Sequence, residues 1–258
     1  MRLQDRVAIV TGGGRGLGEQ IARAYAAEGA RVVLMARTRN EIERVAGDLA
    51  SAGQTALALP GDVSQAEAAR QVVDRTLERF GRIDILVNNA GTLYRGRLAE
   101  MPTEAISQLV DINVKGLLYM SRAALSVLLV RGEGSIINLS SGLGRVGVAD
   151  FVVYCASKFA VEGITQALAA ELKGTGVRVN GLHPGGIADT ALSRRSCADL
   201  WPEDWLPPDI VREPAVYLAS DDAREVTGLV IDATEWTGYP GRRPGLSGPP
   251  QPPGEERK

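Results

Sequence analysis

The sequence predicts a doubly wound α/β fold, with a central parallel sheet of about seven strands and helices on both faces. Short runs rich in Val, Ile and Leu alternate with longer amphipathic stretches along the chain. Hairpin signals are few, so the repeated β–α–β order implies parallel strands joined by right-handed crossovers. A glycine-rich stretch also separates the first apolar run from the first amphipathic one.

Seven segments are expected to form strands. Several are continuous apolar runs rather than alternating patterns, which suits strands covered on both faces. They are Val7–Val10, Arg31–Ala36, Thr55–Leu59, Ile83–Asn88, Ser135–Leu139, Arg178–Leu182 and Leu229–Asp232.

Five helices are expected between these strands. In the second, Ala66–Phe80, apolar residues recur on one face, and Gly81 follows as a C-terminal cap. Pro102 and Thr103 mark the start of the third and longest. The five are Leu17–Glu28, Ala66–Phe80, Thr103 to about Val130, Val152–Lys173 and Pro208–Ser220.

The 258 residues suit one domain over residues 1–237, followed by a tail. In the tail, 238–258, eleven of 21 residues are Gly or Pro, so it can bury little surface and we expect disorder. A net charge of −2 argues against nucleic-acid binding. The first apolar run is too short for a signal peptide or membrane span, and two free cysteines suit a reducing compartment. We expect a cytoplasmic protein without a membrane partner.

The glycine-rich stretch reads Thr-Gly-Gly-Gly-Arg-Gly-Leu-Gly over residues 11–18. The pattern Gly-x3-Gly-x-Gly is neither the common dinucleotide fingerprint nor a P-loop. Glycines nevertheless allow close backbone approach to a pyrophosphate at a helix N-terminus. By itself the stretch fits a nucleotide loop or a tight β–α turn equally well.

Further motifs make the chain resemble the classical short-chain dehydrogenase/reductase family over about residues 5–235. After the loop come Asn88-Asn89-Ala90-Gly91, then Asn113, Ser141 and Tyr154-x3-Lys158. Separations of 28 residues from Asn113 to Ser141 and 13 from Ser141 to Tyr154 match that family. The resemblance implies a Rossmann fold, an oxidoreductase like the 3-oxoacyl-carrier-protein reductases, and a nicotinamide cofactor.

The resemblance also implies which residues hold the cofactor. The purely structural alternative is equally open for Asn88 and Asn89. The implied residues are Gly12, Arg15, Gly16, Leu17, Gly18, Arg37, Asp62, Val63, Asn89, Ala90, Gly91, Tyr154, Lys158, Pro184, Gly185 and Ile187.

Charge at the end of the second strand favours NADP(H) over NAD(H). An acid there would bind the adenosine ribose of NAD, whereas an arginine accommodates the 2′-phosphate of NADP. The strand ends Ala36-Arg37, and Arg15 lies in the glycine loop. Two guanidiniums without a carboxylate suit a phosphate dianion. The alternative is that both arginines are ordinary surface charges.

Tyr154 and Lys158 are four residues apart, so on a helix they share a face. Carbonyl reduction needs a proton donor, and a neighbouring ammonium is expected to lower the pKa of the phenol. The resemblance then makes Tyr154 the acid/base, Lys158 its tuning and ribose-binding partner, and Ser141 the substrate-oxygen ligand. The resemblance also implies that Asn113 supports a water molecule that is linked to Lys158. The alternative for Asn113 is that its side chain satisfies a nearby carbonyl. With one histidine, His183, and two cysteines, no metal site is expected.

One departure concerns the turn after the sixth strand. Where the family places a threonine against the nicotinamide, this chain has Asp189, and Thr190 follows. Either the loop bulges by one residue or Asp189 makes the contact.

Residues 189–210 are expected to form a lid over the substrate. Its tryptophans suggest an apolar, fairly bulky substrate, or a lid docked on the domain. Arg194 and Arg195 would meet an acidic substrate or simply be solvated. The candidate pocket residues are Leu93, Tyr94, Leu143, Phe151, Trp201 and Trp205.

We therefore predict NADPH-dependent reduction of a ketone or aldehyde. The alternatives are NAD-dependent oxidation of an alcohol, such as a hydroxysteroid, and a catalytically silent nucleotide-binding regulator. The resemblance implies a homotetramer, or a dimer, packed through the long helices Thr103–Val130 and Val152–Lys173.

Overall fold

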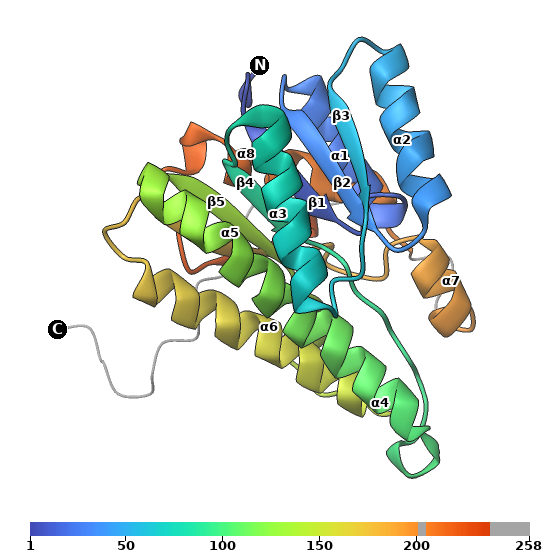
Figure 1. The fold of residues 1–258 in the computed structure, drawn as a ribbon. Helices are drawn as coiled ribbons and strands as arrows, with labels where there is room; N and C mark the ends of the chain where they lie inside the picture. The colour runs from blue at the N-terminus through green and yellow to red at the C-terminus, as the bar shows by residue number, and fades with distance from the viewer. Residues whose placement is uncertain (201–204, 238–258) are drawn as a thin grey trace, which may run out of the picture.

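A seven-stranded parallel sheet runs through the centre of the computed structural model, which describes residues 1–200 and 205–237 (Figure 1). The strand order is β3-β2-β1-β4-β5-β6-β7, and every pairing is parallel. The order reverses between β1 and β4, which is where open α/β sheets bind their ligands. The predicted doubly wound fold is confirmed. The predicted tail, 238–258, lies outside the described residues.

Each strand begins and ends within two residues of its predicted bounds. Most are buried along their whole length, as expected for strands between two helical layers. They are β1 Val7–Thr11, β2 Arg31–Ala36, β3 Ala56–Pro60, β4 Ile85–Asn88, β5 Gly134–Leu139, β6 Val177–His183 and β7 Val230–Asp232.

The predicted helices are present, with two modifications. The long third helix consists of α4 Thr103–Val110, a π-helical turn Asp111–Gly116 and α5 Leu117–Arg131. The segment predicted as Pro208–Ser220 begins with a 3₁₀ turn and continues as α8 Arg212–Ala219. The others are α1 Gly16–Ala27, α3 Ala66–Phe80 and α6 Val152–Glu171.

Three helices were not predicted: α2 Arg39–Ser51, α7 Ala191–Cys197 and α9 Ala233–Thr237. In α2 only Ile42, Val45 and Leu49 are buried, because the helix covers the outer strands at the edge of the sheet. Its remaining residues are mostly charged or small. Such a narrow apolar stripe gives a weak sequence signal.

The two faces of the sheet carry separate apolar layers. One packs Ile21 and Tyr25 of α1, Ile42 of α2 and Leu218 of α8 on the strands. The other packs residues of α3, α5 and α6, among them Met120 of α5. By length and composition the helix Thr103–Arg131 could cross a membrane. Since Met120, Ala124 and Leu128 are fully buried against the sheet, we interpret its apolar character as core packing.

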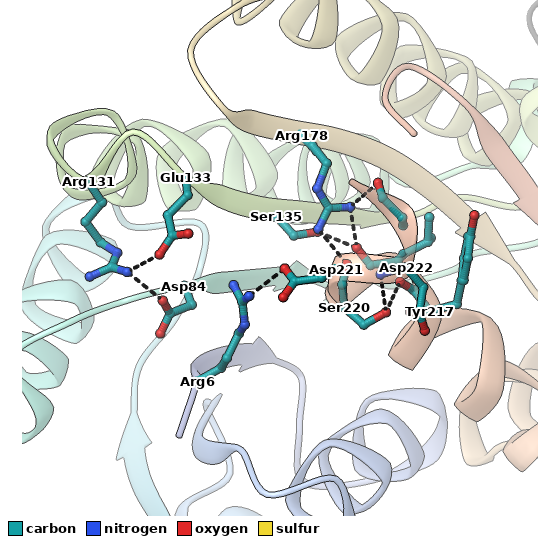
Figure 2. A network of polar contacts seen from close by, with 12 residues as sticks. Arg6, Asp84, Arg131, Glu133, Ser135, Arg178, Tyr217, Ser220, Asp221 and Asp222 are labelled. Atoms are coloured by element: carbon teal, nitrogen blue, oxygen red, sulfur yellow. Dashed lines mark hydrogen bonds and ion pairs between the residues drawn. The ribbon is translucent and has the colours of Figure 1, made fainter. Parts of the chain in front are cut away.

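Ion pairs hold the edge of the sheet where the strands begin, opposite the strand ends that carry the motifs (Figure 2). The fully buried carboxylate of Asp84 accepts bonds from the Val7 amide at 2.8 Å and from Arg82 at 2.6 and 2.9 Å. Arg131 adds a contact at 3.1 Å. Arg6 pairs with the exposed Asp221 nearby.

Replacing Asp84 with Ala is expected to lower the free energy of unfolding by about 3–5 kcal/mol, because two guanidiniums and an amide lose a buried partner. Denaturant unfolding measures the change. Asp221→Ala is the matched control and should cost under about 1 kcal/mol, since its carboxylate is exposed. Equal small losses in both variants would contradict this account.

Candidate active site

The predicted motifs meet at the carboxyl edge of the sheet. Because all strands are parallel, the segments that follow β1, β4, β5 and β6 leave the sheet at the same edge. The glycine loop, Asn88–Gly91, Ser141 and the Pro184-Gly185 turn are these segments.

The glycine loop has the geometry that a dinucleotide needs. Gly12 and Gly16 adopt φ values of 64° and 55°, a region that favours glycine. A Cβ on Gly18 would lie 2.3 Å from the Gly12 carbonyl oxygen and equally close to the Asn89 amide nitrogen. Leu17 and Gly18 lie in the first turn of α1, whose N-terminus has no side-chain cap. Its free N–H groups suit a pyrophosphate.

The Asn88–Gly91 segment is tied to this loop by hydrogen bonds. The Thr11 hydroxyl accepts bonds from the amides of Asn89 and Ala90, both at 3.0 Å. The Asn89 side chain donates to the Thr11 carbonyl at 2.8 Å. Asn88 is buried and donates to Ser121 and Asn138. Both asparagines therefore connect neighbouring strands and loops, which agrees with the purely structural role that was the alternative to cofactor binding.

Helix α6 presents Tyr154 and Lys158 on one face, next to the end of β5. The buried Lys158 ammonium lies 5.8 Å from the centre of the Tyr154 ring and donates to the Leu139 carbonyl at 2.8 Å. The Ser141 hydroxyl lies close enough to the Tyr154 phenol to lower the pKa of that phenol. The three predicted catalytic groups thus form one cluster.

The electrostatic expectation for Tyr154 was wrong in direction. Burial raises the pKa of its phenol to about 12, and the Ser141 hydrogen bond lowers it by less. Burial also lowers the pKa of Lys158 to about 8. Desolvation of both groups has a larger effect here than the attraction between the phenolate and the nearby ammonium, on which the expectation was based.

Asn113 occupies the π-helical turn between α4 and α5, a deviation that often marks functional sites. Its amide donates to the Thr92 carbonyl and to Ser157, and its carbonyl oxygen accepts from the Thr92 amide. The Asn113 side chain therefore satisfies the hydrogen bonds of the Thr92 backbone, which agrees with the alternative of a structural role for Asn113. A small cavity of about 10 Å³ lies between Asn113 and Lys158, roughly the space of one water.

The predicted adenosine side of the site is open. Arg37 is exposed at the end of β2, and Arg15 is 56% exposed. Arg15 pairs with Glu41 of α2 at 3.2 Å. The expectation of two guanidiniums without a carboxylate was therefore wrong, because helix α2, which carries Glu41, was not predicted. Asp62 accepts bonds from the amide and hydroxyl of Ser64, and Val63 packs on Gly116.

The turn after β6 distinguishes Asp189 from Thr190. The carboxylate of Asp189 is bound to Arg194 at 2.6 and 2.7 Å. Thr190 accepts a bond from the Ser193 amide and caps α7. A Cβ on Gly16 would lie 3.4 Å from the Thr190 methyl group, so Thr190 is the residue beside the glycine loop. Of the two alternatives for the turn after β6, this arrangement agrees with a loop that bulges by one residue and brings Thr190 to the position of the family's threonine.

The Pro184-Gly185 turn itself has no room for a side chain. Gly185 has a φ of 91°, and a Cβ there would lie 2.2 Å from Asp232. Its amide donates to Nδ1 of His183, which is buried, and burial lowers the pKa of that imidazole. His183 is a structural residue here.

Apolar side chains gather around Tyr154, some of them from the segment 189–210 that is predicted as a lid. Of the six predicted pocket residues, Leu93, Leu143, Phe151 and Trp205 belong to this cluster, which also contains Ile187, Leu200 and the two buried free cysteines, Cys155 and Cys197. Tyr94 lines a neighbouring cavity instead, and Trp201 lies outside the described residues. Neither cysteine was predicted to line the pocket, because neither belongs to a motif.

Sequence reasoning also missed a buried carboxylate behind Ser141. Glu162 of α6 accepts bonds from Ser140 at 2.9 Å and from Arg145 at 3.2 Å. Ser140 thus supports the turn that carries Ser141. No group of three metal-ligating side chains occurs in the described part of the chain.

These residues fit a nicotinamide dinucleotide. The glycine cradle and the uncapped N-terminus of α1 suit its phosphates. Tyr154, Ser141 and Lys158 lie at the same edge of the sheet, at the end of β5 and the start of α6.

Comparison with known proteins agrees with this geometry. The family described as short chain dehydrogenase matches residues 6–201. An uncharacterized oxidoreductase of Methylorubrum extorquens is 38% identical over 245 residues, covering 90% of this chain and 98% of that protein.

Two crystal structures are also similar. A gluconate 5-dehydrogenase from Burkholderia cenocepacia, in complex with NADP and tartrate, has a TM-score of 0.84 and 31% identity, covering 92% of this chain and 97% of that one. A 3-ketoacyl-(acyl-carrier-protein) reductase from Brucella melitensis, complexed with NADH, has a TM-score of 0.83 and 35% identity, covering 89% and 97%.

Fold, motif order and these relatives agree over most of the chain. The protein belongs to the short-chain dehydrogenase/reductase family and is an oxidoreductase that acts on a carbonyl or alcohol group with an NAD(P) cofactor.

Proposed function

We propose that the protein reduces a ketone or aldehyde to an alcohol with NADPH. The observation that carries this proposal is the cluster of Tyr154, Ser141 and Lys158 beside the glycine loop. The nicotinamide supplies the hydride when it is bound.

The side chains supply the proton and the polarisation. Ser141 donates a hydrogen bond to the substrate oxygen, where negative charge develops. Tyr154 transfers its phenolic proton to that oxygen as the general acid. Lys158 holds a positive charge within 5.8 Å of the phenol ring and favours the phenolate that remains. The small cavity beside Lys158 offers space for the water through which the proton is replaced.

The raised pKa of Tyr154 keeps its phenol in the protonated form that acts as the acid in reduction. With a pKa of about 12, the phenol is protonated at neutral pH and is ready to act as an acid.

Preference for NADPH rests on Arg37 at the end of β2 and on Arg15 in the glycine loop, which pairs with Glu41. Arg37→Asp is expected to reduce kcat/KM for NADPH by roughly 10- to 100-fold and to raise it for NADH, because a carboxylate repels the 2′-phosphate and binds the ribose hydroxyls. Steady-state kinetics with both cofactors measure this ratio. Arg75→Asp on α3 is the control for a change of surface charge. An unchanged ratio in Arg37→Asp would count against the phosphate pocket.

The apolar cluster under the lid supports a substrate with a fairly bulky apolar body. The decisive assay follows NADPH absorbance with a panel of β-keto esters, cyclic ketones, steroids and quinones. Turnover of none of them, with NADPH still bound, would favour the silent regulatory alternative.

We also propose a homo-oligomer, a tetramer or a dimer. One face of α6 exposes Ala156, Phe159, Gly163 and Ala167, and Leu118 of α5 is exposed nearby in the helical layer. Small and apolar side chains of this kind allow helices of two copies to pack closely.

A further inference from the structure

A second cavity, of about 650 Å³, lies beside the apolar cluster between the lid and the loop after β4. We call it the vestibule. Its charged lining residues are Arg95, Arg97, Glu100, Asp150, Arg195 and Asp199. The apolar cluster and the vestibule meet at Leu93, which belongs to both.

Arg95 is the vestibule charge connected most directly to the catalytic phenol. Its guanidinium carbon lies 5.8 Å from the centre of the Phe151 ring, a cation–π distance. Phe151 packs edge-on against Tyr154, with ring centres 6.4 Å apart. One aromatic ring therefore separates the guanidinium from the phenol that would donate the proton.

The backbone fixes Arg95 in this position. The Gly96 amide donates to the Asp150 carbonyl at 2.9 Å, which ties the loop after β4 to the residue before Phe151. Asp150 adopts a φ of 66°, an unusual conformation for a residue other than glycine.

The guanidinium of Arg95 now binds a carboxylate from the lid. Its Nη1 donates to both oxygens of Asp199 at 2.6 and 2.8 Å. The Asp199 side chain is 68% exposed and follows α7, whereas the Arg95 side chain is only 25% exposed. The acid therefore reaches a half-buried cation from the solvent side.

Exposed ion pairs of this kind contribute little to stability. A carboxylate that arrives with an apolar body already docked beside Tyr154 can therefore replace Asp199 at small cost. Arginine suits this exchange, because its fork matches any carboxylate.

We propose that the vestibule receives a carboxylate of the substrate and that Arg95 binds it in place of Asp199. This inference rests on the proposed function and narrows its substrate class to oxo acids or hydroxy acids with an apolar segment. The carbonyl would lie at Tyr154 and Ser141, and the carboxylate at Arg95.

The test compares oxo acids with their methyl esters. The probes are 4-oxopentanoate, 6-oxoheptanoate and 8-oxononanoate, which place the carbonyl at increasing distance from the carboxylate. We expect the wild type to prefer the acid for at least one length. Arg95→Gln should lower the acid-to-ester ratio of kcat/KM by roughly 10- to 100-fold, with little change for the ester. Arg95→Lys should fall between, and Arg75→Gln is the distant control.

Asp199→Asn separates a substrate site from a simple lid latch. If Asp199 competes with substrate, this variant should raise the acid-to-ester ratio several-fold, opposite in sign to Arg95→Gln. If the pair only closes the lid, both variants should slow acids and esters alike, which would overturn the inference. A wild type that prefers the esters would overturn it as well.

Calorimetry makes the result independent of turnover. Binding of 6-oxoheptanoate to the NADPH complex should weaken in Arg95→Gln and strengthen in Asp199→Asn. Binding with these changes but no turnover would contradict the proposed reduction and keep the carboxylate site. If the esters are turned over but acid binding is unchanged in both variants, the proposed reduction is kept and the carboxylate site is contradicted.

Discussion

Tyr154→Phe is expected to lower kcat for carbonyl reduction by about 10³-fold, because a general acid contributes roughly 10²- to 10⁴-fold and this variant removes only its hydroxyl. The ring remains, so its contact with Phe151 and the apolar cluster should persist. Affinity for NADPH should change little. Steady-state kinetics and fluorescence titration of NADPH separate the two effects.

The chain offers a matched control for loss of a buried phenol. Tyr25 of α1 is fully buried, and its hydroxyl donates to the Ala215 carbonyl at 3.0 Å, far from the carboxyl edge. Tyr25→Phe should cost about 1 kcal/mol of stability and leave kcat intact. If Tyr154→Phe kept more than about a tenth of wild-type kcat, the assignment of Tyr154 as proton donor would be wrong.

Lys158→Met is expected to affect activity and stability in opposite directions. Activity should fall by about 10²-fold or more, since the phenolate loses its stabilising cation. The free energy of unfolding at pH 7 should rise by about 2 kcal/mol. Burial lowers the pKa of Lys158 from 10.5 to about 8, which corresponds to about 3 kcal/mol of destabilisation. The lost bond to the Leu139 carbonyl offsets about 1 kcal/mol of this gain.

The dependence on pH gives this prediction a definite sign. The unfolded lysine releases its proton near pH 10.5, whereas the folded one releases it near pH 8. Between these values the unfolded state binds more protons, so wild-type stability should rise with pH relative to Lys158→Met. Denaturant unfolding at pH 7, 9 and 10.5 measures the difference. A constant difference across this range would show that the ammonium is not desolvated.

The activity of the wild type should fall as the pH rises, whereas its stability relative to Lys158→Met should increase. The Tyr154 phenol, with a pKa of about 12, stays protonated up to pH 10, so it should not limit reduction there. Lys158 loses its charge as the pH rises through about 8, and kcat should decline with it.

Much of the fold could be predicted from the sequence. All seven strands were found within two residues, because strands buried on both faces appear as continuous apolar runs. Helix α2 was missed because only three of its side chains are buried at the sheet edge. The π-helical turn at Asn113 was also unpredicted, since it arises from contacts with the Thr92 backbone and Ser157.

The candidate site could be predicted only in part. The resemblance to the family selected Tyr154, Lys158 and Ser141, and the structure brings these residues together. The sequence did not predict that the pKa of Tyr154 is raised, because desolvation depends on the residues that cover the phenol. The Arg15–Glu41 and Arg95–Asp199 pairs were equally invisible, since their partners lie 26 and 104 residues apart.

The sequence by itself determined the parallel sheet and the glycine loop, and its resemblance to the short-chain dehydrogenase/reductase family selected the candidate catalytic groups. The sheet and the loop depend on local periodicity and short spacings, which adjacent residues encode. Only the tertiary structure decided the protonation of Tyr154, the position of Thr190 beside the glycine loop and the pairing of Arg95 with the lid. Burial and charge pairing depend on distances in space between segments that are far apart in the chain.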